Sequence, residues 1–112
     1  MKNGAFCSER LCAIPHFARN SLRISKIVCG SCHTLVITNF GKVYSWGCND
    51  DGALGRITTK EIPENQPRLV DLPVPIDKIS AGDSHSLFSN SVNGLVYMCG
   101  VYRNVLKGNM TE

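Results

Sequence analysis

The stretch ISKIVCGSCHTLVITNFGKVYSWG, residues 24–47, decides the fold because the chain repeats it as IDKISAGDSHSLFSNSVNGLVYMCG, residues 76–100. Six identities occur at a constant offset of 52 residues, and the others follow one inserted residue in the second copy. Eleven residues recur in order: Ile24, Lys26, Ile27, Gly30, His33, Leu35, Gly41, Val43, Tyr44, Gly47 and Gly55 match Ile76, Lys78, Ile79, Gly82, His85, Leu87, Gly94, Val96, Tyr97, Gly100 and Gly108. A repeat of this period indicates that each copy folds as one supersecondary unit.

The repeat also settles the meaning of CGSCH, residues 29–33, which alone has the spacing of a haem attachment motif or of a redox dithiol. In the second copy Ala81 and Ser84 replace Cys29 and Cys32. A structural zinc site needs four ligands, and no second close pair of cysteines is present. We therefore expect no cofactor and no metal, and we interpret Cys29 and Cys32 as small side chains at semi-buried repeat positions.

Alternating and β-branched runs predict short antiparallel strands in each copy. In the first copy these are SKIVCG, HTLVITN and KVYSWG, followed by a fourth strand in RLVDLPVP. In the second copy they are DKISAG, HSLFSNS and LVYMCG, with a hairpin turn expected at Asn93-Gly94. No stretch shows helical periodicity.

Four short antiparallel strands in about fifty residues are typical of a β-propeller blade. The predicted fold is all-β: a partial β-propeller of about two blades of four-stranded antiparallel sheet. The expected organisation is an irregular basic head at residues 1–23, a first repeat at 24–75 and a second, truncated repeat at 76–112. Because a blade buries its faces only against neighbouring blades, we expect the chain to be a fragment of a longer propeller.

Charge is unevenly distributed. The head carries Lys2, Arg10, Arg19 and Arg23 against Glu9, which accounts for the whole net charge of +3. From residue 24 onward eight basic and eight acidic residues balance, so the body lacks the basic cluster that nucleic-acid binding requires. No apolar run approaches the ~20 residues of a membrane span, and a transit peptide remains a weak alternative for the head.

Residues 29–55, CGSCHTLVITNFGKVYSWGCNDDGALG, resemble the regulator of chromosome condensation repeat, whose pattern is A-G-x-x-H-T-x-x-L-T-x-x-G-x-V-Y-x-W-G-x-N-x-x-G-x-L-G. The second copy matches through AGDSHSLFSNSVNGLVYMCG and then keeps only Gly108. The resemblance implies a seven-bladed propeller in the complete protein. It also implies a repeat-building role for ten residues: Gly30, His33, Gly41, Gly47, Gly55, Gly82, His85, Gly94, Gly100 and Gly108.

The segment AGDSHS is similar to the loop of family members that expel guanine nucleotide from the small GTPase Ran. By this resemblance Asp83 is the partner-binding residue, whereas Ser31 supplies no acid at the equivalent place of the first copy. An Asp after a glycine can also simply close a turn, and that alternative stays open for Asp83 and for Asp50 and Asp51. His33 and His85 recur in both copies, which favours a structural hydrogen-bonding role for them.

The resemblance leaves two functions. The first is a fragment of a Ran exchange factor, a regulatory protein with no catalytic residues of its own and inactive alone, whose parent binds Ran and chromatin in the nucleus. The second is a non-catalytic propeller scaffold of the same family, for which a cytoplasmic location fits equally. Neither implies a membrane or a small-molecule substrate.

Overall fold

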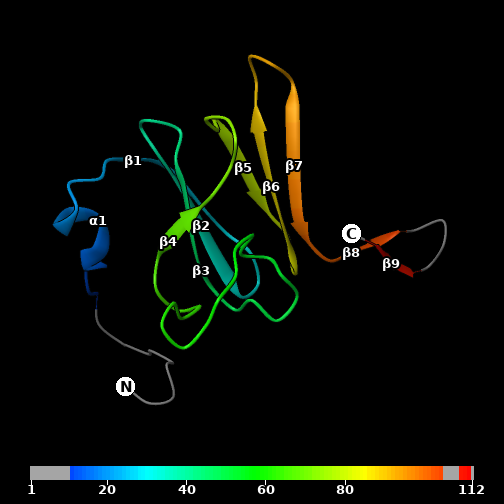
Figure 1. Cartoon of the computed structure of the whole chain (residues 1–112), viewed down its shortest axis with the longest axis horizontal. Coiled ribbons are helices and arrows are strands. Elements are labelled where there is room, and N and C mark those ends of the chain that lie inside the picture. The colour runs from blue at the N-terminus through cyan, green and yellow to red at the C-terminus, as the bar shows by residue number, and fades with distance from the viewer. Residues whose placement is uncertain (1–10, 105–108, 112) are drawn as a thin grey trace.

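The computed structural model describes residues 11–104 and 109–111. These residues form one short helix and nine strands (Figure 1): α1 (Pro15–Arg19), β1 (Ile24–Cys29), β2 (His33–Thr38), β3 (Val43–Gly47), β4 (Arg68–Val70), β5 (Lys78–Ala81), β6 (His85–Asn90), β7 (Leu95–Gly100), β8 (Tyr102–Asn104) and β9 (Asn109–Thr111).

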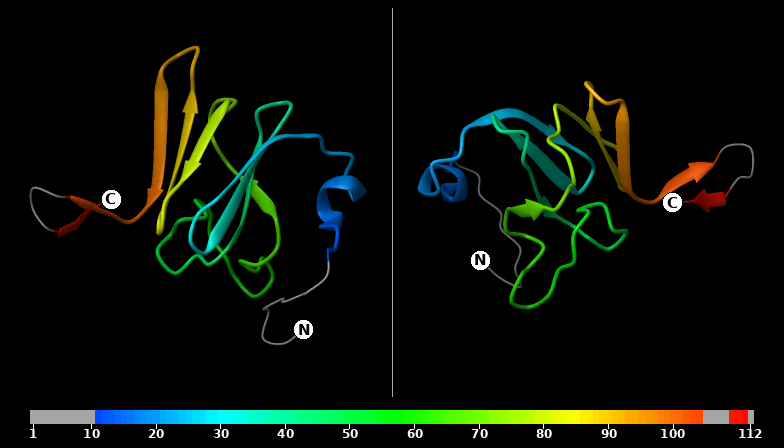
Figure 2. Two further views of the ribbon diagram at one scale, coloured as in Figure 1. Left: turned by 180° about the vertical axis from the view of Figure 1, so that it is seen from behind. Right: turned by 45° about the horizontal axis from the view of Figure 1, so that its top comes forward.

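Two antiparallel sheets carry the two sequence repeats. The first has the order β1-β2-β3-β4 and the second the order β5-β6-β7, while β8 and β9 pair with each other in a separate ribbon. The sheets stand side by side like adjacent blades, with β5 next to β1 and β2 (Figure 2). The predicted all-β, partial propeller fold is confirmed.

The core lies between the two sheets. Strand alternation points one face of the first sheet at the second, so Leu35, Ile37, Val43 and Val70 meet Phe88 there. Each of these five side chains is at most 4% exposed. Burying a side chain of this size contributes about 1.5–3 kcal/mol, so the contact between the two blades is the main stabilising feature of the chain.

Ile76 joins this core from the linker between the two blades. Its side chain is 2% exposed, and its backbone N–H donates to the carbonyl of Gly41 at 2.9 Å. Gly41 lies in the β2–β3 turn, so this hydrogen bond fixes the linker against the first blade. The position occupied by Ile76 in the second repeat is occupied by Ile24 in the first, where the side chain is 37% exposed.

The head differs from the irregular segment that the sequence predicted, because Pro15–Arg19 form α1. A helix of five residues is not stable by itself, and periodicity cannot reveal a single turn. Contacts with the first sheet stabilise it instead. The Phe17 ring lies 5.6 Å from the Tyr44 ring and 5.7 Å from the Trp46 ring, centroid to centroid, on the sheet face that points away from the second blade.

The second blade has the three strands predicted for the truncated second repeat, and its hairpin turn is longer than the Asn-Gly pair. Within the described residues it has three strands in its sheet, and the turn between β6 and β7 comprises the four residues 91–94. Asn93 does not adopt a positive φ, and only Gly94 does, at +74°. The hairpin turn is thus at the predicted Asn93-Gly94, but it is longer than that pair. Asn90 explains the longer turn, since its side-chain oxygen accepts hydrogen bonds from the N–H groups of Val92 and Asn93.

The cysteines of the CGSCH stretch are exposed rather than semi-buried. Cys29 ends β1, which is the edge strand of its sheet, and Cys32 lies in the following loop. Across the described residues, no group of three or more His, Cys, Asp or Glu side chains is arranged to hold a metal ion. The same residues contain no helix with the length and apolar character of a membrane span.

Candidate partner-binding site

The loops at residues 30–32 and 82–84 have the same construction in both blades. In the first, the N–H of Gly30 donates to the carbonyl of His33 at 2.8 Å. In the second, the N–H of Gly82 donates to the carbonyl of His85 at 2.9 Å. Each loop joins the first strand of its sheet to the next strand, and residues of the two loops contact each other, so both loops lie at the same end of the molecule.

Glycine is required in these loops because the histidine ring occupies the space of a side chain. A Cβ at Gly30 would collide with the His33 ring and with the carbonyl oxygen of Gly82 in the other blade. A Cβ at Gly82 would collide with the His85 ring. The spacing Gly-x-x-His is thus a steric unit, in which the ring covers its own glycine.

His33 links the two blades through a buried hydrogen-bond chain. Ser86 Oγ donates its single hydrogen to the carbonyl of Ala53 at 2.7 Å, so His33 Nε2 must carry a hydrogen and donate it to Ser86 Oγ at 2.8 Å. Cys99 Sγ donates to the same carbonyl at 3.3 Å. Burial of the imidazole lowers the pKa of His33, and the nearby His85 lowers it further, while a hydrogen bond to the backbone of His85 acts in the opposite direction.

Asp83 stands at the exposed tip of the second loop and is held by the first. Ser31 Oγ donates to Asp83 Oδ1 at 2.6 Å. The two residues are 52 positions apart, which is the repeat offset, so equivalent loop positions of adjacent blades are hydrogen-bonded to each other. Among the described residues the second carboxylate oxygen has no partner, which leaves a fixed anionic acceptor at the surface.

The sequence did not reveal Ser31 as a partner of Asp83. Ser31 was considered only as the equivalent position of the first copy, where the acidic side chain is missing. The constant offset of the repeat was the available signal. Residues at equivalent repeat positions of neighbouring blades lie close together, so a donor in one blade can hydrogen-bond to an acceptor at the same position in the next blade.

The remaining repeat residues lie in turns and at strand ends. Gly41 and Gly94 occupy the two hairpin turns, and Gly55 lies in the loop that follows β3. Gly47 and Gly100 end β3 and β7 with φ values of +120° and +100°. A Cβ at Gly47 would collide with the backbone where the β1–β2 loop enters β2, and a Cβ at Gly100 with the backbone where the β5–β6 loop enters β6. Gly108 lies outside the described residues.

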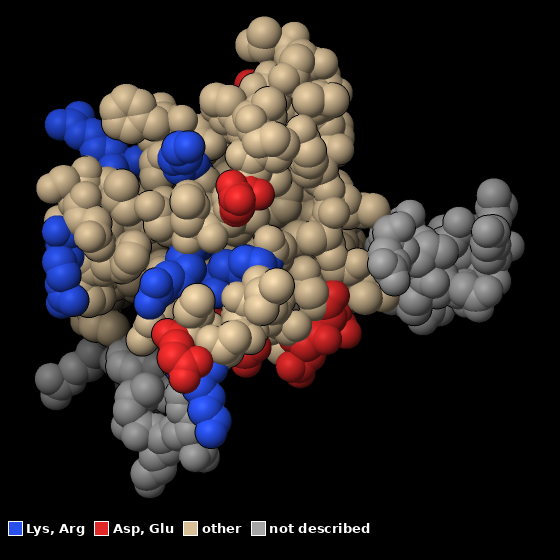
Figure 3. All heavy atoms as spheres, viewed as in Figure 1, with Lys and Arg blue, Asp and Glu red and all other residues tan. Residues whose placement is uncertain are grey.

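Residues 48–67 form a long loop beside the candidate site, and Asn49 organises it. The Asn49 side chain accepts from the N–H of Leu54 at 3.1 Å and donates to the carbonyl of Arg56 at 3.0 Å. Asp50 and Asp51 are exposed in the turn that this produces. Acidic side chains gather at the lower edge of the face drawn in Figure 3, with a few basic side chains between them.

Two blade-like sheets built from one repeated sequence, and joined by loop-to-loop hydrogen bonds, define a repeat protein of the β-propeller class. Models of the regulator of chromosome condensation (RCC1) repeat match residues 41–89 and residues 24–53. The chain belongs to the RCC1 repeat family.

Relatives of known name agree with this assignment. A regulator of chromosome condensation from Drosophila melanogaster is 48% identical over 84 residues, which are 75% of this chain and 15% of the relative. The human protein of the same name is 43% identical over 75 residues, which are 67% of this chain and 18% of that protein. A more distant relative, the serine/threonine-protein kinase Nek9 of Xenopus laevis, is 37% identical over 82 residues, with 70% of this chain and 9% of the kinase covered.

The same similarity holds in three dimensions. Prp20p from Saccharomyces cerevisiae, whose structure was described together with its binding to Gsp1p and histones, superposes with a TM-score of 0.70 at 34% identity over 80% of this chain and 22% of that one. This chain thus spans about a fifth or less of the length of these relatives.

Proposed function

We propose that the chain is part of a guanine nucleotide exchange factor for the GTPase Ran, and that the loop bearing Asp83 contacts the GTPase. The observation that carries the proposal is the exposed Asp83 carboxylate, with one oxygen fixed by Ser31 and the other unpartnered among the described residues. The likeness to the regulators of chromosome condensation and to Prp20p supports the choice of partner.

The physical argument is one of linkage. A protein that binds the nucleotide-free GTPase more tightly than the loaded form must weaken nucleotide binding by the same factor. A carboxylate held in place can compete for the positive groups that bind the nucleotide phosphates on the partner. It would do so without an ordering penalty, since Ser31 already fixes its orientation.

Chromatin contact and a nuclear location belong to the same proposal. Prp20p was described with its binding to histones, and we assign any equivalent contact to sequence other than the body of this chain. The body from residue 24 onward has balanced charge and no basic cluster.

The test is release of labelled nucleotide from Ran by the full-length protein that carries these two blades. We expect Asp83→Ala to lower kcat/KM for release by about tenfold, which corresponds to about 1.4 kcal/mol of lost stabilisation. Asp51→Ala is the matched control, because Asp51 is also exposed and lies in the neighbouring loop. Equal activity of the wild-type protein and the Asp83→Ala variant would remove Asp83 from the interface.

The isolated 112-residue chain should release no nucleotide, since a partner surface on a propeller is assembled from several blades. Rapid release by this chain alone would contradict that expectation.

A scaffold without exchange activity is the second candidate function. The observation that favours it is the presence of the same repeat in a kinase relative. The exchange assay on the full-length protein separates the two, because a scaffold leaves the rate of nucleotide release unchanged.

A further inference from the structure

The first blade has an apolar face on the side that points away from the second blade. We call it the outer face. Side chains alternate between the two sides of a sheet, so the register of β1 to β4 shows which residues share this side. The apolar and aromatic residues on it are Ile27, Val36, Tyr44, Trp46 and Leu69.

The equivalent face of the second blade is a contact between blades. In the repeat alignment, the residues that correspond to Ile27, Val36, Tyr44 and Trp46 are Ile79, Phe88, Tyr97 and Cys99. Phe88 is 2% exposed within the core between the two sheets, and the other three pack against that core. The repeat therefore builds this face to receive the sheet of a neighbouring blade.

On the first blade, α1 lies where a neighbouring sheet would pack. The Phe17 ring lies 5.6 Å from the Tyr44 ring and 5.7 Å from the Trp46 ring, centroid to centroid. The His16 ring lies 5.5 Å from the Tyr44 ring. Val36, on the central strand β2 of the same face, is 1% exposed. The centre of the outer face is thus covered, with one helical turn in place of a sheet.

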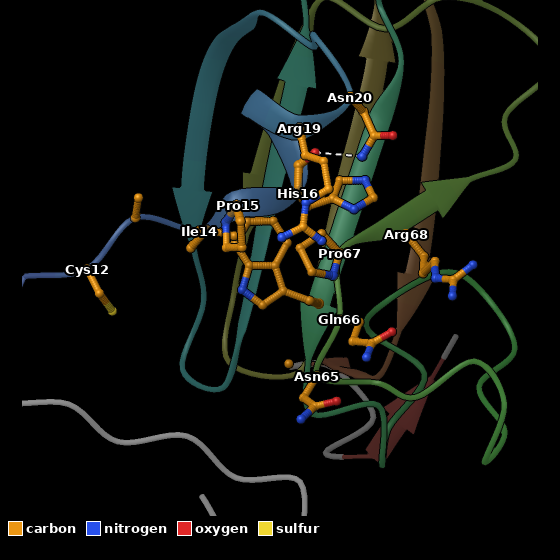
Figure 4. A pocket seen from close by; sticks show the side chains of 13 residues that line it. Cys12, Ile14, Pro15, His16, Arg19, Asn20, Asn65, Gln66, Pro67 and Arg68 are labelled. Atoms are coloured by element: carbon orange, nitrogen blue, oxygen red, sulfur yellow. Dashed lines mark hydrogen bonds between the residues drawn. The ribbon is translucent and has the colours of Figure 1, made fainter.

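This cover is smaller than a blade. Ile27 and Leu69, on the two edge strands of the sheet, are 59% and 47% exposed. A groove with a volume of about 800 Å³ also lies between α1, the end of β3 and the segment that leads into β4 (Figure 4). Because a sheet would bury more apolar area on the outer face than α1 does, a sheet can compete with α1 for it.

The second blade carries a sheet face of the matching kind. The side of its sheet that points away from the core holds three apolar residues, Leu87, Val96 and Met98. In the first blade, the equivalents of Leu87 and Val96 are Leu35 and Val43, which share the core with Phe88. Two copies of the chain can therefore repeat, between molecules, the contact that each makes between its own blades.

From these observations we propose that α1 is a displaceable cap, which keeps the outer face of the first blade from packing against the second blade of another copy. While α1 is docked, only a fraction of the molecules offers a free outer face, and the apparent affinity between copies is reduced by that fraction. When α1 undocks, copies join head to tail in a heterologous contact. The cap acts independently of any exchange function.

The experiment measures the apparent mass of the 112-residue chain against its concentration by sedimentation velocity. Phe17→Ala removes the ring contacts with Tyr44 and Trp46, so we expect it to lower the concentration of half-association about tenfold. Phe17 lies outside the core between the sheets, so the two blades stay together in this variant. Phe40→Ala is the matched control and should leave the wild-type value, because Phe40 is a turn residue that is 86% exposed.

Two further substitutions identify the surface on the second copy. In the Phe17→Ala background, Val96→Lys with Met98→Lys should return the chain to a monomer, because both side chains are exposed on the face that would pack. Association that persists would place the contact elsewhere and overturn the assignment to the second blade. Identical behaviour of Phe17→Ala and the wild-type chain, whether both associate or both stay monomeric, would overturn the cap itself.

A peptide of residues 11–23 gives an independent test if Phe17→Ala does not fold. Added to the wild-type chain at a concentration at which copies associate, it should dissociate them by occupying the outer face. The same peptide with Phe17→Ala should have little effect. If neither peptide dissociates the copies, or if both do so equally, the outer face is not where the copies meet and the proposal fails.

Discussion

His33 shows how one side chain serves both the loop and the contact between blades. Its ring covers Gly30 while Nε2 donates to Ser86, which in turn donates to the carbonyl of Ala53. The ring is 4% exposed, so a charge on it would be poorly solvated. The neutral form with hydrogen on Nε2 is therefore the form that stabilises the fold.

The pH dependence of stability follows from this burial. The pKa of His33 in the folded chain lies below its ordinary value of 6.5, so the unfolded chain binds the proton more tightly. We expect the free energy of unfolding to be constant above about pH 7.5 and to fall as the pH drops below 6.5 toward the folded pKa. Urea titrations at several pH values measure it, and His33→Gln, which keeps a donor for Ser86, should flatten the curve. An NMR titration in which the His33 ring protonates at or above 6.5 would contradict the argument.

At the scale of elements, α1 is held by its tertiary contacts. Ile14 at the N-cap position makes no side-chain capping hydrogen bond, and the helix buries none of its residues fully. Its stability comes from His16 and Phe17, whose rings pack on Tyr44 and Trp46 at centroid distances of 5.5–5.7 Å. The helix thereby covers part of the face that the first blade turns away from the second.

Replacing Phe17 tests this role of α1. We expect Phe17→Ala to lower the free energy of unfolding by about 1–2 kcal/mol, because it removes the ring contacts with Tyr44 and Trp46 on the sheet and partly buried area. It should also shift Trp46 emission to longer wavelength as water reaches the indole. Phe40→Ala, at a turn residue that is 86% exposed, should change stability by less than about 0.5 kcal/mol. Equal effects of the two substitutions would show that α1 does not dock on the sheet in solution.

At the scale of the whole molecule, the two blades bury one interface and leave a second apolar face open. On the second sheet, Val96 and Met98 lie on the same side of β7 and point away from the core, with 65% and 42% of their surface exposed. Leu87 lies opposite Met98 on the neighbouring strand. An exposed apolar sheet face of this kind favours association between copies.

We therefore expect the isolated chain to self-associate as its concentration rises, and Val96→Lys with Met98→Lys to suppress this. Static light scattering measures the apparent mass. Val92→Lys is the control, because Val92 is 94% exposed but lies on the β6–β7 turn rather than on the sheet face. If the turn substitution suppresses association as strongly as the double substitution, the sheet face is not responsible.

The sequence predicted the secondary structure correctly where the same residue pattern recurs in both copies. The strands of both copies and the four-stranded first sheet follow from alternation and from turn residues, and the structure has them. The β6–β7 turn includes Asn93-Gly94 as predicted, but the sequence did not give its four-residue length, which the Asn90 side chain supports. The helix in the head was missed because one turn has no period to detect.

The candidate site was predictable only in part. The sequence could single out Asp83 by resemblance, but its hydrogen bond to Ser31 depends on how two loops 52 residues apart are brought together.

The sequence by itself determined the repeating strand pattern and the glycines at its turns, because these depend on local sterics and on the alternation of side chains along each strand. Only the tertiary structure decided which equivalent positions of the two blades meet and which face of the first sheet α1 covers. Those features arise from packing between segments distant in the chain, and local residue preferences carry no information about such distances.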